Sequence, residues 1–517
     1  MKGVKHTMIK SRKMMAIVMA GMIMSLTFSA CGNSKTESVN TTETVSAEAT
    51  QSEEDTNMEK PDGEPPEGEI PEGEPPTGDK PDGEPPTGEK PDGEPPEGGP
   101  GGAPGGAPGG SSADIDYTGS KEVASAGTVS GETISSTTAD ESAILVSTSD
   151  EVTISNVTVT KSGDSDGGDN CNFYGLNATV LVKDGSTTTI TNANITSDAD
   201  GANGVFSYGG NGGQNGAAGD GTAVIIKDST IVTTGDGSGG IMTTGGGVTY
   251  AYDLDITTSG RSSAAIRTDR GGGTVYVDGG TYVTNGLGSP TIYSTADITV
   301  ENATLTSNLS EGVCIEGKNS ITLKNCDMTA NNTDCNGNAT FNDTIMIYQS
   351  MSGDADSGTS SFSMTGGSLT SLNGHMFHVT NTNAVITLEG VKLVNKDSEG
   401  ILLSVCDDGW SGAENRATLN LVGQKAEGAI LVGDNSYLTM NITDGSTFTG
   451  CFSGEITNAK GETVSSNIGS VSVTLESGST WNLTGDCYIT EFTGNAGDIV
   501  SNGYTVYVNG TALTGTK

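Results

Sequence analysis

Two segments, Ile298-Thr-Val-Glu-Asn-Ala-Thr-Leu305 and Ile321-Thr-Leu-Lys-Asn-Cys-Asp-Met328, decide the fold of this chain. They carry one frame, 23 residues apart, in which apolar residues alternate with polar ones and an asparagine follows. Alternation with period two is typical of a strand with one buried face. Asparagine accepts a left-handed backbone conformation, so it favours a sharp bend. The frame therefore predicts two short strands joined by a bend.

The same frame recurs along most of the chain. Its second apolar position is held by Ile154, Ile190, Ile226, Ala251, Val277, Val300, Leu323, Met364 and Leu388. Two residues later stand Asn156, Asn192, Asp228, Asp253, Gly279, Asn302, Asn325, Gly366 and Gly390. Spacings of 23 to 26 residues in the cleanest stretches match one turn of a solenoid, and the gaps of 36 and 41 predict inserted loops. We therefore predict a single-stranded parallel β-helix over residues 113–517, with a C-terminal cap from about residue 440.

The N-terminus has the features of a secretory signal. Basic residues precede an apolar run from Met14 to Phe28, and Ser29-Ala30-Cys31 follows. This order resembles a bacterial lipobox, from which Phe28 departs because leucine is preferred there. We expect residues 1–30 to be removed and Cys31 to carry a lipid anchor in the membrane. The alternative is an ordinary signal peptide cleaved near Ala30.

Residues 31–112 have the composition of a stalk. A ten-residue repeat begins at Lys60, Lys80 and Lys90 with the letters KPDGEPP, and a Gly/Pro/Ala-rich stretch ends the segment. Pro-rich, charged segments are disordered but extended, so the stalk could reach on the order of 200 Å. We expect it to project the β-helix through the cell wall, on the extracellular face of the membrane.

Composition restricts the partners and the core. With 65 acidic against 24 basic residues, the net charge of −41 opposes nucleic-acid binding. Hydrophobic content of 32% and aromatic content of 5% indicate a thin, repetitive core, and we expect a monomer. The eight cysteines form no CxxC pair, and no cysteine pair stands at ligand spacing beside a histidine, so a zinc site is not expected.

Three stretches carry a resemblance to a known group of proteins. They are SSAAIRTDRGGGTVYVDGG at 262–280, SPTIYSTADITVENATLT at 289–306 and EGVCIEGKNSITLKNCDMT at 311–329. The chain from about 115 to 510 resembles adhesin-like surface lipoproteins of Gram-positive gut bacteria, in the pectin-lyase-like fold group. The resemblance implies a right-handed β-helix. It implies no catalytic residue that can be placed on this sequence.

Enzymes of that fold group cleave acidic polysaccharides, so the resemblance leaves two catalytic alternatives, a hydrolase and a lyase. A hydrolase needs two carboxyls about 5 to 10 Å apart. Asn332-Thr-Asp334, Asp407-Asp408 and Gly374-His375 have the residue types, but their order and separation are wrong. A lyase would use Asp269 with Arg267 and Arg270, whereas a salt-bridged turn before three glycines explains the same residues.

One loop has the residue types of a calcium site. Asp164, Asp166, Asp169 and Asn170 alternate with serine and glycine, which supply oxygen ligands and a tight turn. Calcium is therefore a possible cofactor, and an acidic, solvated loop is the alternative interpretation.

A second set of apolar positions predicts a binding face. The residues that follow Val205, Ile241, Ile266, Ile292, Ile315, Ile347 and Phe377 should point outward. These are Phe206, Met242, Arg267, Tyr293, Glu316, Tyr348 and His378, here called the predicted column. Stacked coil upon coil, they would form one recognition strip, with Arg267, Tyr293 and Glu316 spanning roughly 10 Å. A covering loop over such side chains is the alternative.

These observations lead to two functional hypotheses. The first is a non-catalytic, lipid-anchored surface protein that binds an extracellular polysaccharide or a host or cell-wall ligand. The second is a polysaccharide lyase or glycoside hydrolase of the same fold group. A third possibility is a spacer that binds nothing.

Overall fold

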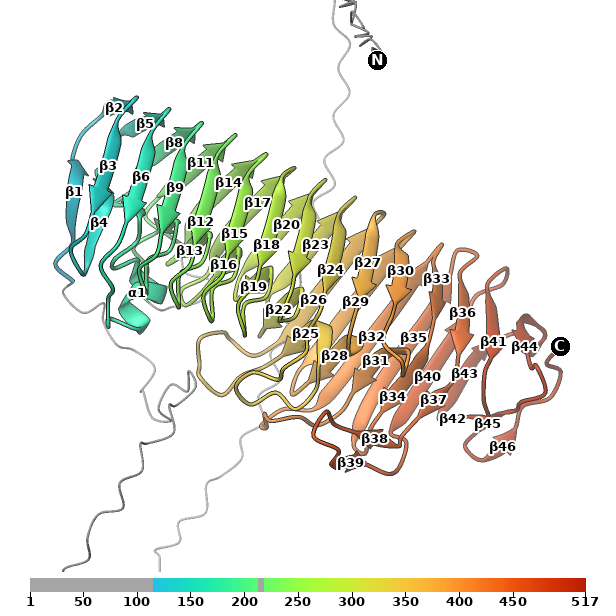
Figure 1. The fold of residues 1–517 in the computed structure, drawn as a ribbon. Coiled ribbons are helices and arrows are strands. Elements are labelled where there is room, and N and C mark those ends of the chain that lie inside the picture. The colour runs from blue at the N-terminus through green and yellow to red at the C-terminus, as the bar shows by residue number, and fades with distance from the viewer. Residues whose placement is uncertain (1–114, 213–217) are drawn as a thin grey trace, which may run out of the picture. The chain divides into compact units, whose positions relative to one another are not determined.

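The chain winds into a parallel β-helix, in which each coil up to β30 contributes one strand to each of three long sheets (Figure 1). In the later coils a fourth sheet takes the place of the third. The structure is a computed structural model, and it describes residues 115–212 and 218–517. The predicted signal peptide, Cys31 and the stalk lie outside the described residues. Within the described ranges, no helix is long and apolar enough to cross a membrane.

The three sheets follow one another around each coil, and their strands pair with the preceding and following coils. Sheet A contains β1 (Thr118–Val123), β4 (Glu141–Ser147), β7 (Val180–Lys183), β10 (Val205–Tyr208), β13 (Ile241–Thr244), β16 (Ile266–Thr268), β19 (Ile292–Ser294), β22 (Val313–Glu316), β25 (Asp343–Tyr348), β28 (His375–Thr380), β31 (Ile401–Val405), β34 (Ala429–Val432) and β37 (Phe452–Ser453). Sheet B contains β2 (Gly127–Ser130), β5 (Glu151–Ser155), β8 (Thr187–Thr191), β11 (Ala223–Lys227), β14 (Gly247–Tyr252), β17 (Gly273–Asp278), β20 (Asp297–Glu301), β23 (Ser320–Lys324), β26 (Thr359–Thr365), β29 (Asn383–Glu389), β32 (Asn415–Val422), β35 (Ser436–Thr443), β40 (Ser470–Leu475) and β43 (Glu491–Gly494). Sheet C contains β3 (Thr133–Ser136), β6 (Thr158–Lys161), β9 (Asn194–Ser197), β12 (Thr230–Thr233), β15 (Asp255–Thr258), β18 (Thr281–Thr284), β21 (Thr304–Ser307), β24 (Asp327–Ala330), β27 (Ser368–Ser371) and β30 (Lys392–Asn395).

Smaller elements complete the C-terminal end and one loop. A fourth sheet, D, contains β33 (Lys425–Glu427), β36 (Thr447–Gly450), β41 (Thr480–Leu483) and β44 (Ile499–Val500). The remaining elements are α1 (Asp169–Tyr174), β38 (Ile456–Thr457), β39 (Thr463–Ser465), β42 (Cys487–Ile489), η1 (Ala496–Asp498), β45 (Val506–Val508) and β46 (Thr511–Ala512). The region expected to be a cap, from about residue 440, still contributes strands to sheets B and D.

The bend between sheets B and C confirms the frame read from the sequence. All nine predicted bend residues have positive φ, from 47° at Asp228 to 77° at Gly279. Asparagine, aspartate and glycine occupy these positions because they tolerate the left-handed region at the lowest cost. Each bend directs the chain from a sheet B strand into a sheet C strand at the same point of the coil.

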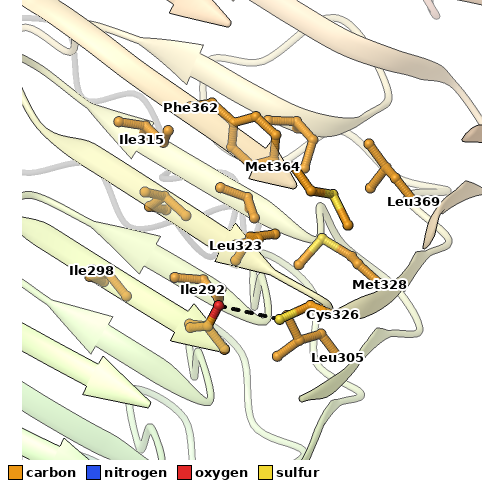
Figure 2. Close-up of a cluster of buried hydrophobic side chains, with 14 of the residues drawn as sticks. Ile292, Ile298, Leu305, Ile315, Leu323, Cys326, Met328, Phe362, Met364 and Leu369 are labelled. Atoms are coloured by element: carbon orange, nitrogen blue, oxygen red, sulfur yellow. Dashed lines mark hydrogen bonds between the residues drawn. The ribbon is translucent and has the colours of Figure 1, made fainter. Parts of the chain in front are cut away.

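The core is a continuous stack of apolar side chains inside the coils. Figure 2 shows Ile298, Leu323 and Phe362 among the buried residues that line it, together with Met328 and Leu369 from sheet C. Each coil buries its apolar side chains mainly against its two neighbours, so stability accumulates along the stack. Cys326 lies within this core, and its thiol donates to the carbonyl oxygen of Val300 at 3.3 Å (Figure 2).

The cysteines of the described residues are free thiols. Five are buried (Cys171, Cys314, Cys326, Cys406 and Cys487) and two are partly exposed (Cys335 and Cys451). They pack mostly as small apolar side chains, as expected from their sequence pattern.

The bend can be tested at Asn325, whose φ is 51°. We expect Asn325→Ala to lower the free energy of unfolding by about 1–2 kcal/mol, because alanine is strained in the left-handed region. Asn325→Gly is the matched control and should change it by about 0.5 kcal/mol or less, since glycine occupies this position in other coils. Urea unfolding of both variants measures the difference. Equal losses in the two variants would contradict the assigned role.

Candidate functional site

The outer face of sheet A carries most of the candidate residues. Phe206, Met242, Arg267 and Tyr293 lie opposite one another on successive strands, as predicted. Tyr293, however, pairs with Cys314 and not with Glu316. The predicted column is therefore wrong in register beyond β19.

The error has a definite cause. Ile292 and Ile298 are six positions apart, whereas the corresponding residues of the next coil, Val313 and Ile321, are eight apart. The path from β22 into β23 is thus two residues longer, one in the strand and one in the turn, and aligning Ile292 with Ile315 shifts the frame by two. The column that starts at Phe206 continues from Tyr293 through Cys314 and Met346 to His378. Glu316 and Tyr348 pair with each other two positions further along their strands.

Loops cover this face instead of leaving it open. Phe206 and Met242 are fully buried in a cluster with Phe173 and Tyr174 of α1. The insertion between β6 and β7 that contains α1 therefore packs on the outside of sheet A near its N-terminal end (Figure 1). The exposure assumed for these two positions is not observed.

Arg267 connects the α1 insertion to the rest of the site. Its guanidinium lies 5.6 Å from the centre of the Tyr293 ring and 2.7 Å from a carboxylate oxygen of Asp269. It also donates to the side chain of Asn172 at 3.2 Å. Burial raises the pKa of Asp269 to about 6, and the Arg267 guanidinium opposes that shift. Asp269 is therefore partly protonated near pH 6.

Glu316 is the centre of a network of hydroxyl groups. Its Oε2 accepts hydrogen bonds from the phenols of Tyr293 at 2.6 Å and Tyr348 at 3.1 Å. Its Oε1 accepts from the hydroxyls of Ser350 and Ser352. Burial raises the pKa of Glu316, and donation from these hydroxyls opposes the rise.

The two serines belong to a segment we call the strap, residues 349–358, which joins β25 to β26. Arg270 holds the strap through Asp354, with nitrogen to oxygen distances of 2.6 and 3.0 Å. Arg270 follows β16, three strands before β25 in sheet A, so the strap reaches back along the outer face. Lys318, in the turn after β22, forms a second ion pair with the strap, 2.8 Å from a carboxylate oxygen of Asp356.

A second insertion, residues 406–414, meets the strap. Its Trp410 is partly exposed, and its ring centre lies 4.9 Å from that of Tyr348. Met351 of the strap is exposed close by, with its sulfur 3.9 Å from the Ser411 hydroxyl. An aromatic and an apolar side chain are thus accessible to solvent directly beside the Glu316 network.

A shallow groove lies between the bases of these two insertions. It has a volume of about 300 Å³, and most of its lining residues are polar types, but their apolar atoms form the larger part of its accessible surface. Its lining residues are Gln349, Ser357, Gly358, Thr359, Asn381, Thr382, Asn383, Ala413, Glu414 and Arg416. The Arg416 guanidinium also lies 4.1 Å from the centre of the Tyr437 ring, on the surface beside the groove. Amides, hydroxyls, one guanidinium and one carboxylate thus converge there.

Beyond the strap lies a buried polar cluster around His378. Ser404 Oγ is 2.7 Å from His378 Nδ1 and 2.8 Å from His375 Nδ1. His378 Nε2 lies 3.3 Å from an oxygen of Asp408, which also accepts hydrogen bonds from Thr340. Burial and the neighbouring His378 lower the pKa of His375 to about 3.

This cluster does not form an open catalytic site. Ser404, His378 and His375 are all buried, and Phe341 lies against both imidazole rings, 4.7 and 5.4 Å between ring centres. Both carboxylate oxygens of Asp343 are buried without a hydrogen-bond partner among the described residues. Burial raises the pKa of Asp343 well above its usual range, which favours its neutral form.

The other catalytic candidates are separated. Asp269 pairs with Arg267, whereas Arg270 pairs with Asp354, so the two guanidiniums do not share one carboxylate. Asp408 meets His378, but Asp334 is exposed and bonds to its neighbour Thr333. These contacts are those of ion pairs and turns that hold loops in place.

The calcium candidates lie just before and within α1. Asp164, Asp166 and Asp169 are exposed, and Asp164 accepts a hydrogen bond from the backbone of Asp200. Within residues 115–212 and 218–517, no group of three or more His, Cys, Asp or Glu side chains is arranged to hold a metal ion. Calcium binding stays a prediction.

Sequence reasoning missed Trp410 and the strap. The 41-residue gap between Leu323 and Met364 signalled an insertion in this coil, but not its path back along sheet A. Comparison of the chain with protein-family models, curated proteins and solved structures finds no match. Inference about function therefore depends on the geometry of this chain.

Proposed function

We propose that this chain is a non-catalytic surface protein that binds a neutral, hydroxyl-rich polysaccharide on the outer face of sheet A. The binding region comprises Trp410, the strap and the adjoining groove. In the proposal the lipid anchor at Cys31 and the stalk display the β-helix outside the cell membrane, as an adhesin-like lipoprotein.

The observation that carries the proposal is the partly exposed Trp410, which packs against Tyr348 and belongs to the insertion whose residues Ala413 and Glu414 line the groove. Aromatic rings supply a large, rigid contact surface, and polar groups around them fix orientation. Only 9 of the 517 residues are Phe and 2 are Trp, so an accessible tryptophan is a rare feature in this chain.

Charge favours a neutral ligand over an acidic one. The strap and the groove carry Asp354, Asp356 and Glu414, and the whole chain has a net charge of −41. Each of these three carboxylates is paired with a basic residue, Arg270, Lys318 or Arg416, so the repulsion of a polyanion comes from the net charge of the whole chain. A neutral glycan avoids this repulsion and still offers many hydroxyl donors.

The non-catalytic part of the proposal is supported by the state of the acidic residues. Asp269, Glu316 and Asp408 each bond to side chains of the protein itself and lie beneath loops. Glycoside hydrolysis needs two carboxyls beside the scissile bond, whereas the groove lining contains one, Glu414, which is paired with Arg416 at 2.7 Å.

The proposal is tested with purified mature protein and a panel of neutral oligosaccharides, by calorimetry and by assay of released products. For any oligosaccharide that binds, we expect Trp410→Ala to weaken affinity at least about fivefold, because central aromatic residues dominate such contacts. Tyr250→Ala is the matched control, since Tyr250 is an exposed aromatic residue on sheet B, 40% accessible. It should leave affinity unchanged.

Two outcomes would contradict the proposal. Equal effects of Trp410→Ala and Tyr250→Ala would remove Trp410 from the binding region. Release of new reducing ends or unsaturated products by the wild-type protein would replace binding by catalysis.

A further inference from the structure

The strap donates hydroxyl hydrogen bonds to the Glu316 carboxylate, and hydroxyls are the groups that a sugar would offer. The Ser350 and Ser352 hydroxyls both approach Oε1 of Glu316, and their own oxygens are 2.7 Å apart. Two neighbouring hydroxyls directed at one carboxylate oxygen are also what a sugar ring presents. In the described residues, both side-chain hydrogen bonds to this Oε1 come from the strap.

The rest of the Glu316 site has the form of a recognition site. Two tyrosine hydroxyls hold the other carboxylate oxygen, and the Tyr348 ring continues outward to Trp410. A buried carboxylate costs folding free energy that an apolar residue of similar size would not. The presence of the Glu316 carboxylate beneath the strap is explained if a ligand can take the place of the strap.

The strap is held mainly by polar contacts and buries little apolar surface. The pair of Asp356 with Lys318 is half exposed and contributes little once water screens it, whereas the pair of Asp354 with Arg270 is mostly buried. Gln349 and Ala355 are the buried residues of the strap, and the Gln349 amide donates to the Ala355 carbonyl. Residues 349–358 form no strand, and Met351, Ser352 and Gly353 are exposed. Segments with few buried contacts open locally without unfolding the coils beneath them.

We propose that the strap is a displaceable cover, which closes the Glu316 site by mimicking the hydroxyl groups of the ligand. A neutral glycan displaces Ser350 and Ser352, donates its own hydroxyls to Glu316, and stacks against Tyr348 and Trp410. This inference rests on the proposed function, and it names Glu316 as the recognition residue beneath the cover.

Removal of the competing hydroxyls tests the inference. In Ser350→Ala/Ser352→Ala, we expect the affinity for a bound neutral oligosaccharide to rise about five- to tenfold, with faster association, because the ligand no longer competes with the strap. Glu316→Gln should lower affinity about tenfold, since charged acceptors form the stronger hydrogen bonds. Ser363→Ala, on the outer face of sheet B, is the control and should match the wild type.

A second measurement separates a cover from a merely structural loop. Hydrogen exchange of residues 349–358 should accelerate in the double variant, and also in the wild type when oligosaccharide is added. Thermal unfolding of each variant checks that the coils remain folded.

The outcomes distinguish this inference from the proposed function. Oligosaccharide binding that requires Trp410 but is unchanged in the double variant and in Glu316→Gln would overturn the inference and leave the function standing. Absence of binding in both the wild type and the double variant would overturn both. Binding by the double variant alone would support a closed cover.

Discussion

Trp481→Ala is expected to lower the free energy of unfolding by about 3–5 kcal/mol, the usual cost of removing a buried aromatic side chain. Trp481 is fully buried near the C-terminal end of the coils. Its ring centre lies 5.4 Å from that of Phe452 and 6.3 Å from that of Phe448. Its indole nitrogen donates to the Gly450 carbonyl at 3.1 Å. The substitution therefore removes both packing and a hydrogen bond from the closing coils.

Urea unfolding followed by circular dichroism measures this effect. Tyr488→Ala is the matched control, because Tyr488 is 51% exposed and stacks only on its neighbour Tyr507. It should cost about 0.5 kcal/mol or less, as exposed positions usually do. If both variants unfold at the same urea concentration as the wild type, Trp481 does not close the core.

The second large effect concerns pH and His375. Its pKa is lowered to about 3, first by burial and then by the nearby His378, while Asp397 acts in the opposite direction. The unfolded chain binds a proton at a pKa near 6.5, whereas the folded chain resists it. Stability therefore falls as pH decreases from about 6.5 toward 3. The total contribution is on the order of 5 kcal/mol, because the pKa differs by about 3.5 units and each unit corresponds to about 1.4 kcal/mol.

The His375→Gln variant isolates this contribution. Glutamine does not titrate, so the free energy of unfolding should depend less steeply on pH, by up to about 1.4 kcal/mol per pH unit between pH 6 and 4. The pKa values of Asp343 and Glu311 are raised, so these two residues make stability increase as pH falls, opposite to His375. Both are present in the wild type and in the variant, so their effects cancel in the comparison. Parallel curves for the two proteins over this range would show that His375 titrates normally.

The coil frame could be predicted from the sequence because its signals are local and repeated. Alternating apolar residues and a left-handed bend residue recur in every coil, and the bend tolerates few residue types. Asn302 and Asn325 illustrate this, since both have positive φ at the predicted place. Repetition of a local rule nine times fixes the fold without knowledge of any long-range contact.

The surface could not be predicted in the same way. The path from β22 into β23 is longer by two residues than that of the preceding coil, and nothing in the pattern of Ile292 and Ile315 reveals it. The contact between Arg270 and Asp354 joins positions 84 residues apart, so it depends on the path of an insertion rather than on periodicity. Asp408 reaches His378 for the same reason, because it lies in the insertion 406–414. The sequence pattern identified an outward face, but not the loops that bury it.

Hydrogen exchange across the whole β-helix, with and without a bound neutral oligosaccharide, tests the central claim that the outer face of sheet A is the binding face. We expect slower exchange in residues 406–414 around Trp410 and at the groove-lining starts of β26, β29 and β32, and faster exchange in the strap, residues 349–358. Sheet C and the rest of sheet B should be unchanged. Protection confined to the outer faces of sheets B or C would contradict the claim.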